Sequence, residues 1–245
     1  MSKKQVKLFP PLRGVYVDLS KVPDPVFAEK MVGDGFAIDP LENVLYSPID
    51  GKIKSIHRAK HAITLESESG FDILIHIGLE TVSLGGKGFD VKVKEGQLVK
   101  VGDKLTEFDM DYIAGNVVAL ITPVLVTDME EKQISIDILP HGVVTDLNQA
   151  IMLVTLGGEK AAQLADTSVA PVVASLESEL ITIPNTHGIH ARPAAQLNAI
   201  ARKYPNNEIL MLKGEQSANV KSVVSLLSLS VQYQDQIKIL VKGDN

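Results

Sequence analysis

Residues 60–82 read K-H-A-I-T-L-E-S-E-S-G-F-D-I-L-I-H-I-G-L-E-T-V. Two runs rich in aliphatic and β-branched residues, 62–66 and 71–77, flank a short polar stretch that ends in glycine, a pattern typical of a β-hairpin. Working outward, similar short apolar runs recur up to about residue 108, separated by Gly, Pro or Asp at intervals of about 8–12 residues. This spacing predicts an all-β sandwich or barrel for the N-terminal part of the chain.

A histidine lies near one end of each predicted strand, at positions 61 and 76. A two-residue turn at 68–69 makes His61 and His76 direct cross-strand neighbours, with Cβ atoms about 5 Å apart. Moving that turn by one residue keeps both on one face, and only a three-residue loop or a bulge would separate them. Such a pair can carry a phosphoryl group on one ring while the other donates to its oxygens, or it can supply half of a zinc site. The alternative is a core histidine satisfied by a backbone carbonyl.

The composition excludes several classes of protein. The chain has 245 residues, 45% of them hydrophobic and 22% charged, so it can bury a core in one large domain or two ordinary ones. A net charge of −6, no tryptophan and 4% aromatic residues argue against a nucleic-acid partner. The absence of cysteine excludes disulfides, thiolate zinc sites and cysteine nucleophiles.

No segment is typical of membrane insertion or export. The longest mostly apolar stretch, 117–126, is too short to span a bilayer and contains a proline. The first seven residues are polar and lack the apolar core of a signal peptide. We therefore expect a cytoplasmic protein without direct membrane insertion.

The charge is divided unevenly along the chain, which predicts two domains. Residues 1–156 carry a net charge of −6, residues 157–178 carry −2 and residues 179–245 carry +2. The middle segment is rich in Ala, Ser and Gly and has no amphipathic period, which predicts a flexible linker.

The C-terminal segment alternates between strand and helix patterns. We expect strands at 181–183, 209–212 and 237–241 and helices at 193–204 and 222–231. The first helix presents one apolar stripe, made of Ala194, Leu197, Ile200, Ala201 and Tyr204. A helix with such a stripe lies on a sheet, so the segment predicts a small α+β open-faced sandwich.

The segment 188–195, G-I-H-A-R-P-A-A, places a histidine at a predicted helix N-terminus. Pro193 suits the first helical turn, which puts His190 among free backbone N–H groups at the positive end of the helix dipole. The Arg192 guanidinium can pair with phosphate oxygens through two hydrogen bonds. The alternative is a histidine that caps the helix next to a solvated arginine.

The hairpin and its surroundings resemble the glucose-type enzyme IIA of the bacterial phosphoenolpyruvate–sugar phosphotransferase system. The resemblance covers roughly residues 20–155 and is carried by G-F-D-I-L-I-H-I-G-L-E-T-V at 70–82, V-P-D-P-V-F-A-E-K-M-V-G-D-G at 22–35, S-P-I-D-G at 47–51 and E-G-Q-L-V-K-V-G-D at 95–103. It implies that His76 is phosphorylated, that His61 supports it, and that Gly78 leaves backbone room beside the phosphoryl group. It requires no cofactor and allows zinc at His61 and His76.

This segment departs from the family at two positions and has one rival interpretation. Ala59 stands where the family often has threonine, and Glu80 stands where aspartate is common. Parts of the segment also resemble biotinyl and lipoyl carrier domains. Those domains need a lysine at a hairpin tip, and the nearest equivalent here, 109–111, reads D-M-D.

Residues 179–245 resemble HPr, the histidine phosphocarrier of the same system. The resemblance implies that His190 is phosphorylated, that Arg192 is its partner and that Ala191 supports the phosphate. K-S-V-V at 221–224 resembles a second HPr motif, which makes Ser222 a candidate regulatory phosphosite. The alternative for Ser222 is a helix N-cap. No role is assigned to His187, and His57 and His141 are interpreted as ordinary surface or structural residues.

Together the two resemblances imply a phosphotransferase relay for sugar uptake. Phosphate would pass from enzyme I to His190, then to His76, and then to a cysteine in the EIIB domain of a membrane permease that also contains EIIC. The alternative is a regulatory binding module controlled by its phosphorylation state. HPr domains close with a final helix that is absent here, so we expect a fragment of an enzyme IIA–HPr–enzyme I fusion. The sugar is not determined by this chain, and N-acetylglucosamine or glucose are the favoured substrates.

Overall fold

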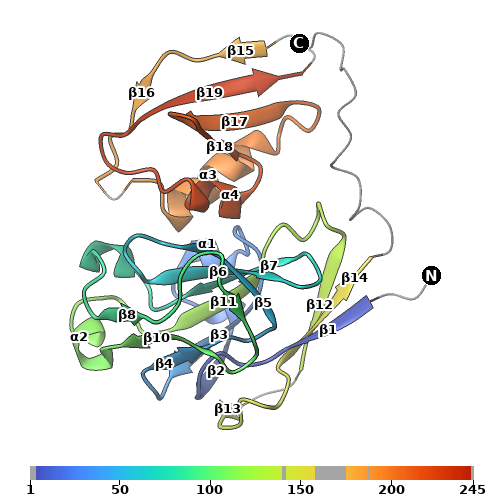
Figure 1. Cartoon of the computed structure of the whole chain (residues 1–245), viewed down its shortest axis with the longest axis vertical. Coiled ribbons are helices and arrows are strands. Elements are labelled where there is room, and N and C mark those ends of the chain that lie inside the picture. The colour runs from blue at the N-terminus through green and yellow to red at the C-terminus, as the bar shows by residue number, and fades with distance from the viewer. Residues whose placement is uncertain (1–3, 140–141, 158–174, 187, 244–245) are drawn as a thin grey trace. The chain divides into compact units, whose positions relative to one another are not determined.

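The chain folds into two compact units, Met1–Ala161 and Ala162–Asn245, which we call unit 1 and unit 2. The computed structural model describes residues 4–139, 142–157, 175–186 and 188–243 (Figure 1). Most of the predicted linker, 158–174, therefore lies outside the described residues. Over the described ranges no helix combines the length and the apolar character needed to cross a membrane.

Unit 1 consists mostly of antiparallel strands, which confirms the predicted all-β class. Its strands are β1 (Lys4–Leu8), β2 (Gly14–Asp18), β3 (Asp34–Pro40), β4 (Val44–Tyr46), β5 (Gly51–Ile56), β6 (Ala62–Ser67), β7 (Asp72–His76), β8 (Phe89–Val91), β9 (Leu98–Val99), β10 (Lys104–Phe108), β11 (Thr122–Val126), β12 (Ile134–Ile138), β13 (Val143–Val144) and β14 (Met152–Leu156). The helical turns between them are η1 (Leu19–Lys21), α1 (Pro25–Ala28), η2 (Thr81–Leu84) and α2 (Met110–Ala114).

The strands of unit 1 form three open sheets. The largest has eight strands in the order β13-β2-β3-β11-β7-β6-β5-β9, and the two smaller sheets have the orders β1-β14-β12 and β4-β10-β8. Because the eight-stranded sheet ends in β13 on one side and β9 on the other among the described strands, it does not close. The sequence predicted a sandwich or a barrel. The closed barrel is wrong, and the open sheets agree with the sandwich.

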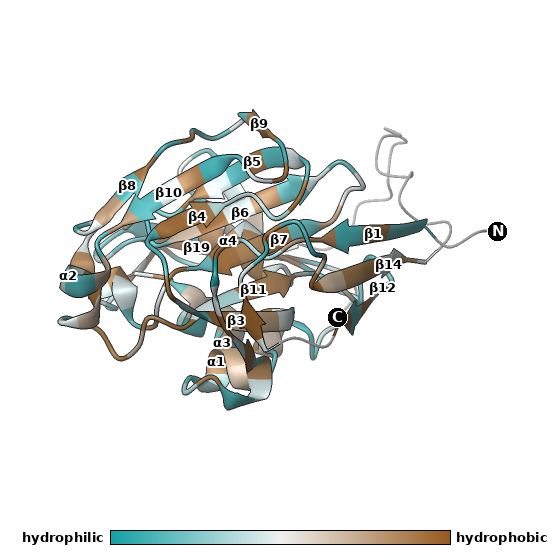
Figure 2. Ribbon diagram, turned by 90° about the horizontal axis from the view of Figure 1, so that it is seen from below, coloured by the Kyte–Doolittle hydropathy of each residue, from teal (hydrophilic) through white to brown (hydrophobic). Residues whose placement is uncertain are grey.

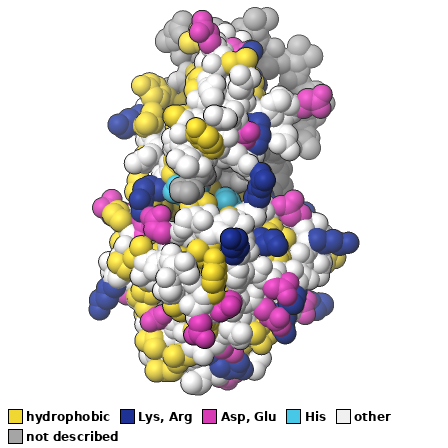
Figure 3. Space-filling view, turned by 90° about the vertical axis from the view of Figure 1, so that its left-hand side faces the viewer, with side chains coloured by type: hydrophobic (Ala, Val, Ile, Leu, Met, Phe, Trp, Pro, Cys, Tyr) yellow, Lys and Arg dark blue, Asp and Glu magenta, His cyan; other side chains and the backbone are white. Residues whose placement is uncertain are grey.

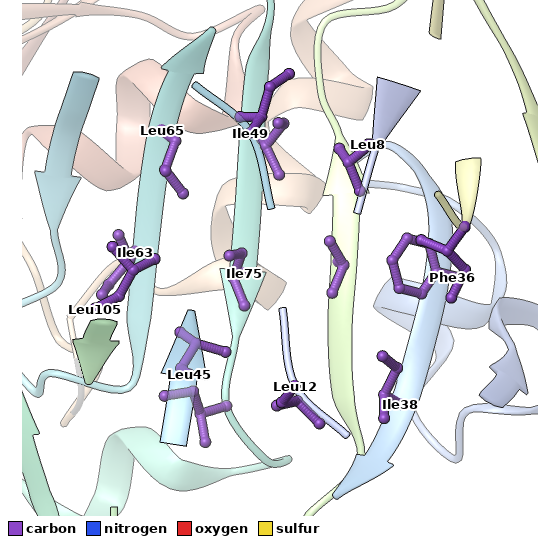
Figure 4. Close-up of a cluster of buried hydrophobic side chains, with 14 of the residues drawn as sticks. Leu8, Leu12, Phe36, Ile38, Leu45, Ile49, Ile63, Leu65, Ile75 and Leu105 are labelled. Atoms are coloured by element: carbon purple, nitrogen blue, oxygen red, sulfur yellow. The ribbon is translucent and has the colours of Figure 1, made fainter. Parts of the chain in front are cut away.

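The core of unit 1 lies on one face of the large sheet. Alternate residues of β6 and β7 point to this face, and their cross-strand partners are Ile63 with Ile75 and Leu65 with Ile73. All four are at most 1% exposed, and they pack with residues such as Phe36 in the cluster drawn in Figure 4. Figure 2 shows hydrophobic residues along β7 and along the neighbouring strands β11 and β3. The opposite face of β7 carries His76.

The hairpin between β6 and β7 has a different register from the predicted one. Glu66 pairs with Asp72, and the Ser67 N–H donates to the Phe71 carbonyl at 2.8 Å, so residues 68–70 form a three-residue loop. Gly70 closes this loop at φ +82°, a left-handed conformation that is common at the last position of such loops. The predicted two-residue turn, and with it the direct pairing of the two histidines, is wrong.

Unit 2 is the predicted small α+β sandwich. Its elements are β15 (Ser175–Glu177), β16 (Ile181–Thr182), α3 (Ala191–Ala201), β17 (Glu208–Lys213), β18 (Gln216–Asn219), α4 (Val223–Ser228) and β19 (Gln236–Lys242). The sheet order is β15-β19-β17-β18, and β16 also pairs with β19. The sequence patterns missed β18, whose residues are mostly polar, and β15, which falls within the last residues of the predicted linker.

The buried face of α3 differs from the predicted stripe. Ala194, Asn198 and Ala201 are at most 5% exposed, whereas Ile200 and Tyr204 are 56% and 55% exposed. Tyr204 lies beyond the end of the helix, and Ile200 is turned away from the face that the alanines share. Asn198 is buried because its side-chain amide donates to the Lys221 carbonyl. The core face of α3 therefore includes the hydrogen-bonded Asn198 and excludes Ile200, which the apolar pattern had assigned to it.

Charged side chains of both signs are interspersed over the face drawn in Figure 3. Ion pairs among the described residues include Lys52 with Glu66 at 2.9 Å and Lys30 with Asp34 at 2.8 Å. Pairs as exposed as these contribute little to folding stability, so the fold depends on the apolar clusters.

Candidate functional site

His76 is the last residue of β7 and has a defined tautomer. Its side chain is buried at 7% exposure, and its Nδ1 lies 2.8 Å from the Gly78 carbonyl oxygen. A carbonyl oxygen can only accept a hydrogen bond, so we assign the ring proton to Nδ1. In the neutral ring the lone pair is then on Nε2, which is the nitrogen that can act as a nucleophile or a ligand.

The carbonyl that orients His76 is itself held in place. Gly78 adopts φ +67°, and an added Cβ would lie 2.8 Å from Thr81 Cγ2 and 3.1 Å from the Ala119 carbonyl oxygen. The Thr81 hydroxyl donates to the Ile77 carbonyl at 2.9 Å, which ties the following turn to the end of β7. Glycine is needed at position 78 because both the left-handed backbone and the crowding disfavour a side chain.

His61 lies against His76, although not through the predicted pairing. The two ring centroids are 4.6 Å apart with an interplanar angle of 65°, and His61 is 2% exposed. In the observed register His76 is opposite Ala62, and the Ile77 N–H donates to the His61 carbonyl at 2.7 Å. Regular alternation would put the two rings on opposite faces. They meet because His61 precedes β6, in a bend whose side-chain direction strand geometry does not determine.

Two further rings pack against this pair. Phe27, from α1, packs edge-on against His76 with centroids 5.3 Å apart at 60°. His57 packs against His61 with centroids 4.5 Å apart at 55°. The interpretation of His57 as an ordinary residue missed this contact. The signal in the sequence was that His57 lies four residues before His61. The strand pattern alone does not predict that the segment between them brings the two rings into contact.

The second candidate site lies at the N-terminus of α3. His190 occupies the N-cap position with φ −98° and ψ −170°, but its side chain makes no capping hydrogen bond. The alternative in which its imidazole caps the helix is therefore wrong. Arg192 is exposed in the first turn, next to the buried Ala191, and Pro193 follows as predicted. The N–H groups of the first turn and the guanidinium can both attract an anion here.

Gly188 shapes the loop that leads to His190. It adopts φ +66°, and an added Cβ would lie 2.1 Å from the Val231 carbonyl oxygen. The Ile189 N–H donates to that same carbonyl at 2.9 Å, so the loop before α3 is fixed against the segment before β19. The two remaining histidines, His141 and His187, lie outside the described residues.

Ser222 is the N-cap of α4, as its alternative interpretation predicts. Its side chain accepts a hydrogen bond from the Ser225 N–H at 3.2 Å. The neighbouring Lys221 ammonium donates to the carbonyls of Tyr204, Pro205 and Asn207 at 2.7, 3.1 and 2.6 Å. These contacts explain the motif structurally, and a regulatory role for Ser222 stays a prediction.

The two-histidine arrangement fits half of a zinc site. The rings of His61 and His76 have centroids 4.6 Å apart, and neutral imidazole nitrogens are good zinc ligands. Among the described residues no group of three or more His, Cys, Asp or Glu side chains is arranged to hold a metal. Zinc at His61 and His76 would need ligands besides these two, so this site also stays a prediction.

Comparison with protein families identifies the larger part of the chain. The family model described as phosphoenolpyruvate-dependent sugar phosphotransferase system, EIIA 1, matches residues 6–132, which is more than half of the chain. The chain belongs to this EIIA family. A second family model, described as PTS HPr component phosphorylation site, matches residues 177–245. The chain thus joins an EIIA domain to an HPr domain, as both resemblances predict.

Relatives of the EIIA domain agree with this assignment. A glucose-specific EIIA component of the phosphotransferase system from Staphylococcus epidermidis is 45% identical over 130 residues, which cover 53% of this chain and 78% of the relative. A glucose-specific EIIA component from Staphylococcus aureus is 40% identical over 154 residues, covering 63% of this chain and 92% of the relative. The solved structure of glucose permease IIA from Mycoplasma capricolum is 37% identical with a TM-score of 0.57, covering 61% of this chain and 96% of that chain.

The two domains define the general activity of the protein. EIIA and HPr domains are phosphocarriers of one sugar phosphotransferase system, so their union in one chain indicates a phosphoryl relay. Such domains interact with other components of that system.

Proposed function

We propose that this chain receives a phosphoryl group from enzyme I on His190, transfers it to His76, and delivers it to a cysteine in the EIIB domain of a membrane sugar permease. The observation that carries the proposal is the hydrogen bond between His76 Nδ1 and the Gly78 carbonyl, made beside the ring of His61. It leaves one nitrogen of His76 nucleophilic and provides a second imidazole next to it.

At His76 the reaction is an in-line displacement at phosphorus. The Nε2 lone pair forms the new N–P bond while the N–P bond of the donor phosphohistidine breaks, and the electron pair returns to the donor ring. His61 is suited to donate a ring N–H to the transferred oxygens, because its ring lies next to His76 and is buried. Delivery reverses this step, with a thiolate of the permease as the attacking nucleophile.

At His190 the helix supplies the charge stabilisation that side chains supply at His76. The N–H groups of Ala191 and Arg192 lie in the first turn of α3, where an incoming phosphoryl oxygen can accept hydrogen bonds. The Arg192 guanidinium can pair with the remaining oxygens. Transfer between such sites depends on positioning and on charge stabilisation more than on acid–base chemistry.

The proposal is tested by following the phosphoryl group with single histidine variants. The full chain is incubated with enzyme I and labelled phosphoenolpyruvate, and modified residues are located by mass spectrometry. We expect acid-labile, base-stable label on both His76 and His190 in the unaltered chain. His76→Ala should keep label on His190 alone. His190→Ala should lose both labels, and intact HPr added in trans should restore the label on His76.

Delivery is tested with a purified EIIB domain. Label should leave His76 and appear on the EIIB cysteine, and the His61→Ala chain should deliver it at least about tenfold more slowly because one donor to the phosphoryl oxygens is lost. If neither histidine is labelled under conditions in which enzyme I labels intact HPr, the proposed function is wrong. If phosphorylated and unphosphorylated chains instead differ only in which proteins they retain in pull-downs, the regulatory alternative replaces it.

A further inference from the structure

Three imidazoles lie in a row that ends at the proposed phosphoryl acceptor. His57 packs on His61 at a centroid distance of 4.5 Å, and His61 packs on His76 at 4.6 Å. The interplanar angles of 55° and 65° describe tilted and edge-on contacts rather than stacked rings. His57 is half-buried, His61 is 2% exposed and His76 is 7% exposed, so His61, the middle ring, is the most deeply buried of the three.

His57 is tied into its turn through its backbone and its ring. Its N–H donates to the Ala62 carbonyl at 2.9 Å, and its carbonyl accepts from the Lys60 N–H at 2.6 Å. Its Nδ1 accepts from the Ala59 N–H at 3.1 Å, which fixes the orientation of the ring. Lys60 closes the turn at φ +58°, an uncommon conformation for a residue with a long side chain. These hydrogen bonds therefore hold the His57 ring in one orientation.

His61 needs support from a neighbouring ring more than an ordinary strand residue does. It precedes β6, and in the register of β6 with β7 regular alternation would aim it away from His76. Its position against His76 must therefore come from what its ring touches. The contacts of the His61 ring include the ring of His57 at 4.5 Å and the ring of His76 at 4.6 Å.

We propose that His57 is a positioning residue for phosphoryl transfer, which holds the ring of His61 against His76. The inference rests on the proposed function of those two histidines. His57 acts through the face of its ring and takes no part in the bonds that form or break. A displacement of about 1 Å in a positioned group can cost up to about a hundredfold in rate, so loss of this contact should be measurable.

Three substitutions separate the ring of His57 from its hydrogen-bonding nitrogen. His57→Phe keeps a ring against His61 but loses the acceptor for the Ala59 N–H. His57→Asn keeps an acceptor near the place of Nδ1 but loses most of the ring. His57→Ala loses both. We expect the single-turnover rate of label transfer to His76 to fall about tenfold in the Ala and Asn variants and by less than about threefold in the Phe variant.

A double-mutant cycle shows whether His57 acts through His61. In the full chain carrying His61→Ala, the additional change His57→Ala should have no further effect on the transfer rate, because the ring it would hold is gone. Nuclear Overhauser contacts between the ring protons of His61 and His76 should be present in the unaltered chain and in His57→Phe, and lost in His57→Ala. If His57→Ala slowed transfer only through a general loss of stability, we would not expect His57→Phe to restore the transfer rate.

The outcomes distinguish this inference from the proposed function. If His76 takes up no label in the unaltered chain, the proposed function fails. If it takes up label and His57→Ala transfers at the unaltered rate, the positioning role is overturned. It is also overturned if His57→Ala slows transfer equally with His61 present and with His61→Ala, since His57 would then act by another route.

Discussion

The two candidate phosphoryl sites hold a histidine in contrasting ways. His76 ends a strand, is 7% exposed, and is oriented by a backbone carbonyl and by the rings of Phe27 and His61. His190 is half-buried at the N-cap of α3 and makes no capping hydrogen bond. The first site is therefore defined by side-chain packing, and the second by the exposed end of a helix dipole. One chain thus uses two different physical means for the same proposed chemistry.

The sites nevertheless share a left-handed glycine two residues from the histidine, and the crowding around each glycine differs. A Cβ on Gly188 would meet the Val231 backbone oxygen at 2.1 Å, which only a movement of the chain can relieve. A Cβ on Gly78 would come closest to Thr81 Cγ2 at 2.8 Å, and a side-chain methyl group can move more easily. The backbone around the His190 site should tolerate substitution less well than that around the His76 site.

The largest expected effect tests this difference in unit 2. Gly188→Ala should lower the free energy of unfolding of unit 2 by about 3–5 kcal/mol, because a left-handed alanine is strained and its Cβ overlaps backbone. Hydrogen exchange of unit 2 peptides in the full chain, read by mass spectrometry, measures the loss.

Gly214→Ala is the matched control for this change. Gly214 has a similar φ of +58° but no atom within 4 Å of the added Cβ, so it should cost only about 1–2 kcal/mol. Equal losses in the two variants would show that the contact with Val231 does not matter.

A smaller effect is expected at the His76 site. Gly78→Ala should cost about 1–3 kcal/mol in unit 1 and slow labelling of His76 about tenfold, because the carbonyl that binds Nδ1 must shift. The control is Gly70→Ala, at φ +82° with open space around the added Cβ, which should leave the labelling rate unchanged. A Gly78→Ala chain that labels at the unaltered rate would contradict the role of this carbonyl in orienting the ring.

The smallest effect concerns acid stability in unit 1. The hydrogen bond from the Lys52 ammonium holds the pKa of Glu66 below its ordinary value. Because the pKa of Glu66 is lowered in the folded state, its ionised carboxylate stabilises the fold at pH values above the ordinary pKa. This stability is lost as the pH falls through the pKa of the folded state. The Glu66 side chain is 40% exposed, so the contribution is at most about 0.5 kcal/mol.

Lys52→Met should therefore reduce the loss of unit 1 stability between about pH 6 and pH 3, and leave unit 2 unchanged. Lys100→Met is a suitable control, because the Lys100 side chain is 80% exposed and its ammonium lies 4.0 Å from Asp50. Hydrogen exchange at the two pH values reports on both units at once. A change in unit 2 would mean that the units do not respond separately.

Sequence reasoning succeeded where the signal is local. The two apolar runs at 62–66 and 71–77 correctly predicted a hairpin, and the proline after Arg192 correctly predicted a helix that begins near His190. It failed for polar or short strands such as β18, because their stability comes from neighbouring strands rather than from their own residues. It also failed for Ile200, because the face of α3 that is buried depends on how its side chains pack against the sheet and α4.

The sequence alone determined the residue types: a histidine in an apolar strand, a second before its partner strand, a third ahead of a proline-containing helix, and glycines where the backbone turns left-handed. Only the tertiary structure decided how they meet. A three-residue loop shifted the hairpin register and removed the predicted pairing, and ring contacts with His57 and His76 then oriented His61 in its bend. The reason is physical: strand alternation aims side chains only within a strand, and beyond its end their direction is set by packing against residues distant in the chain.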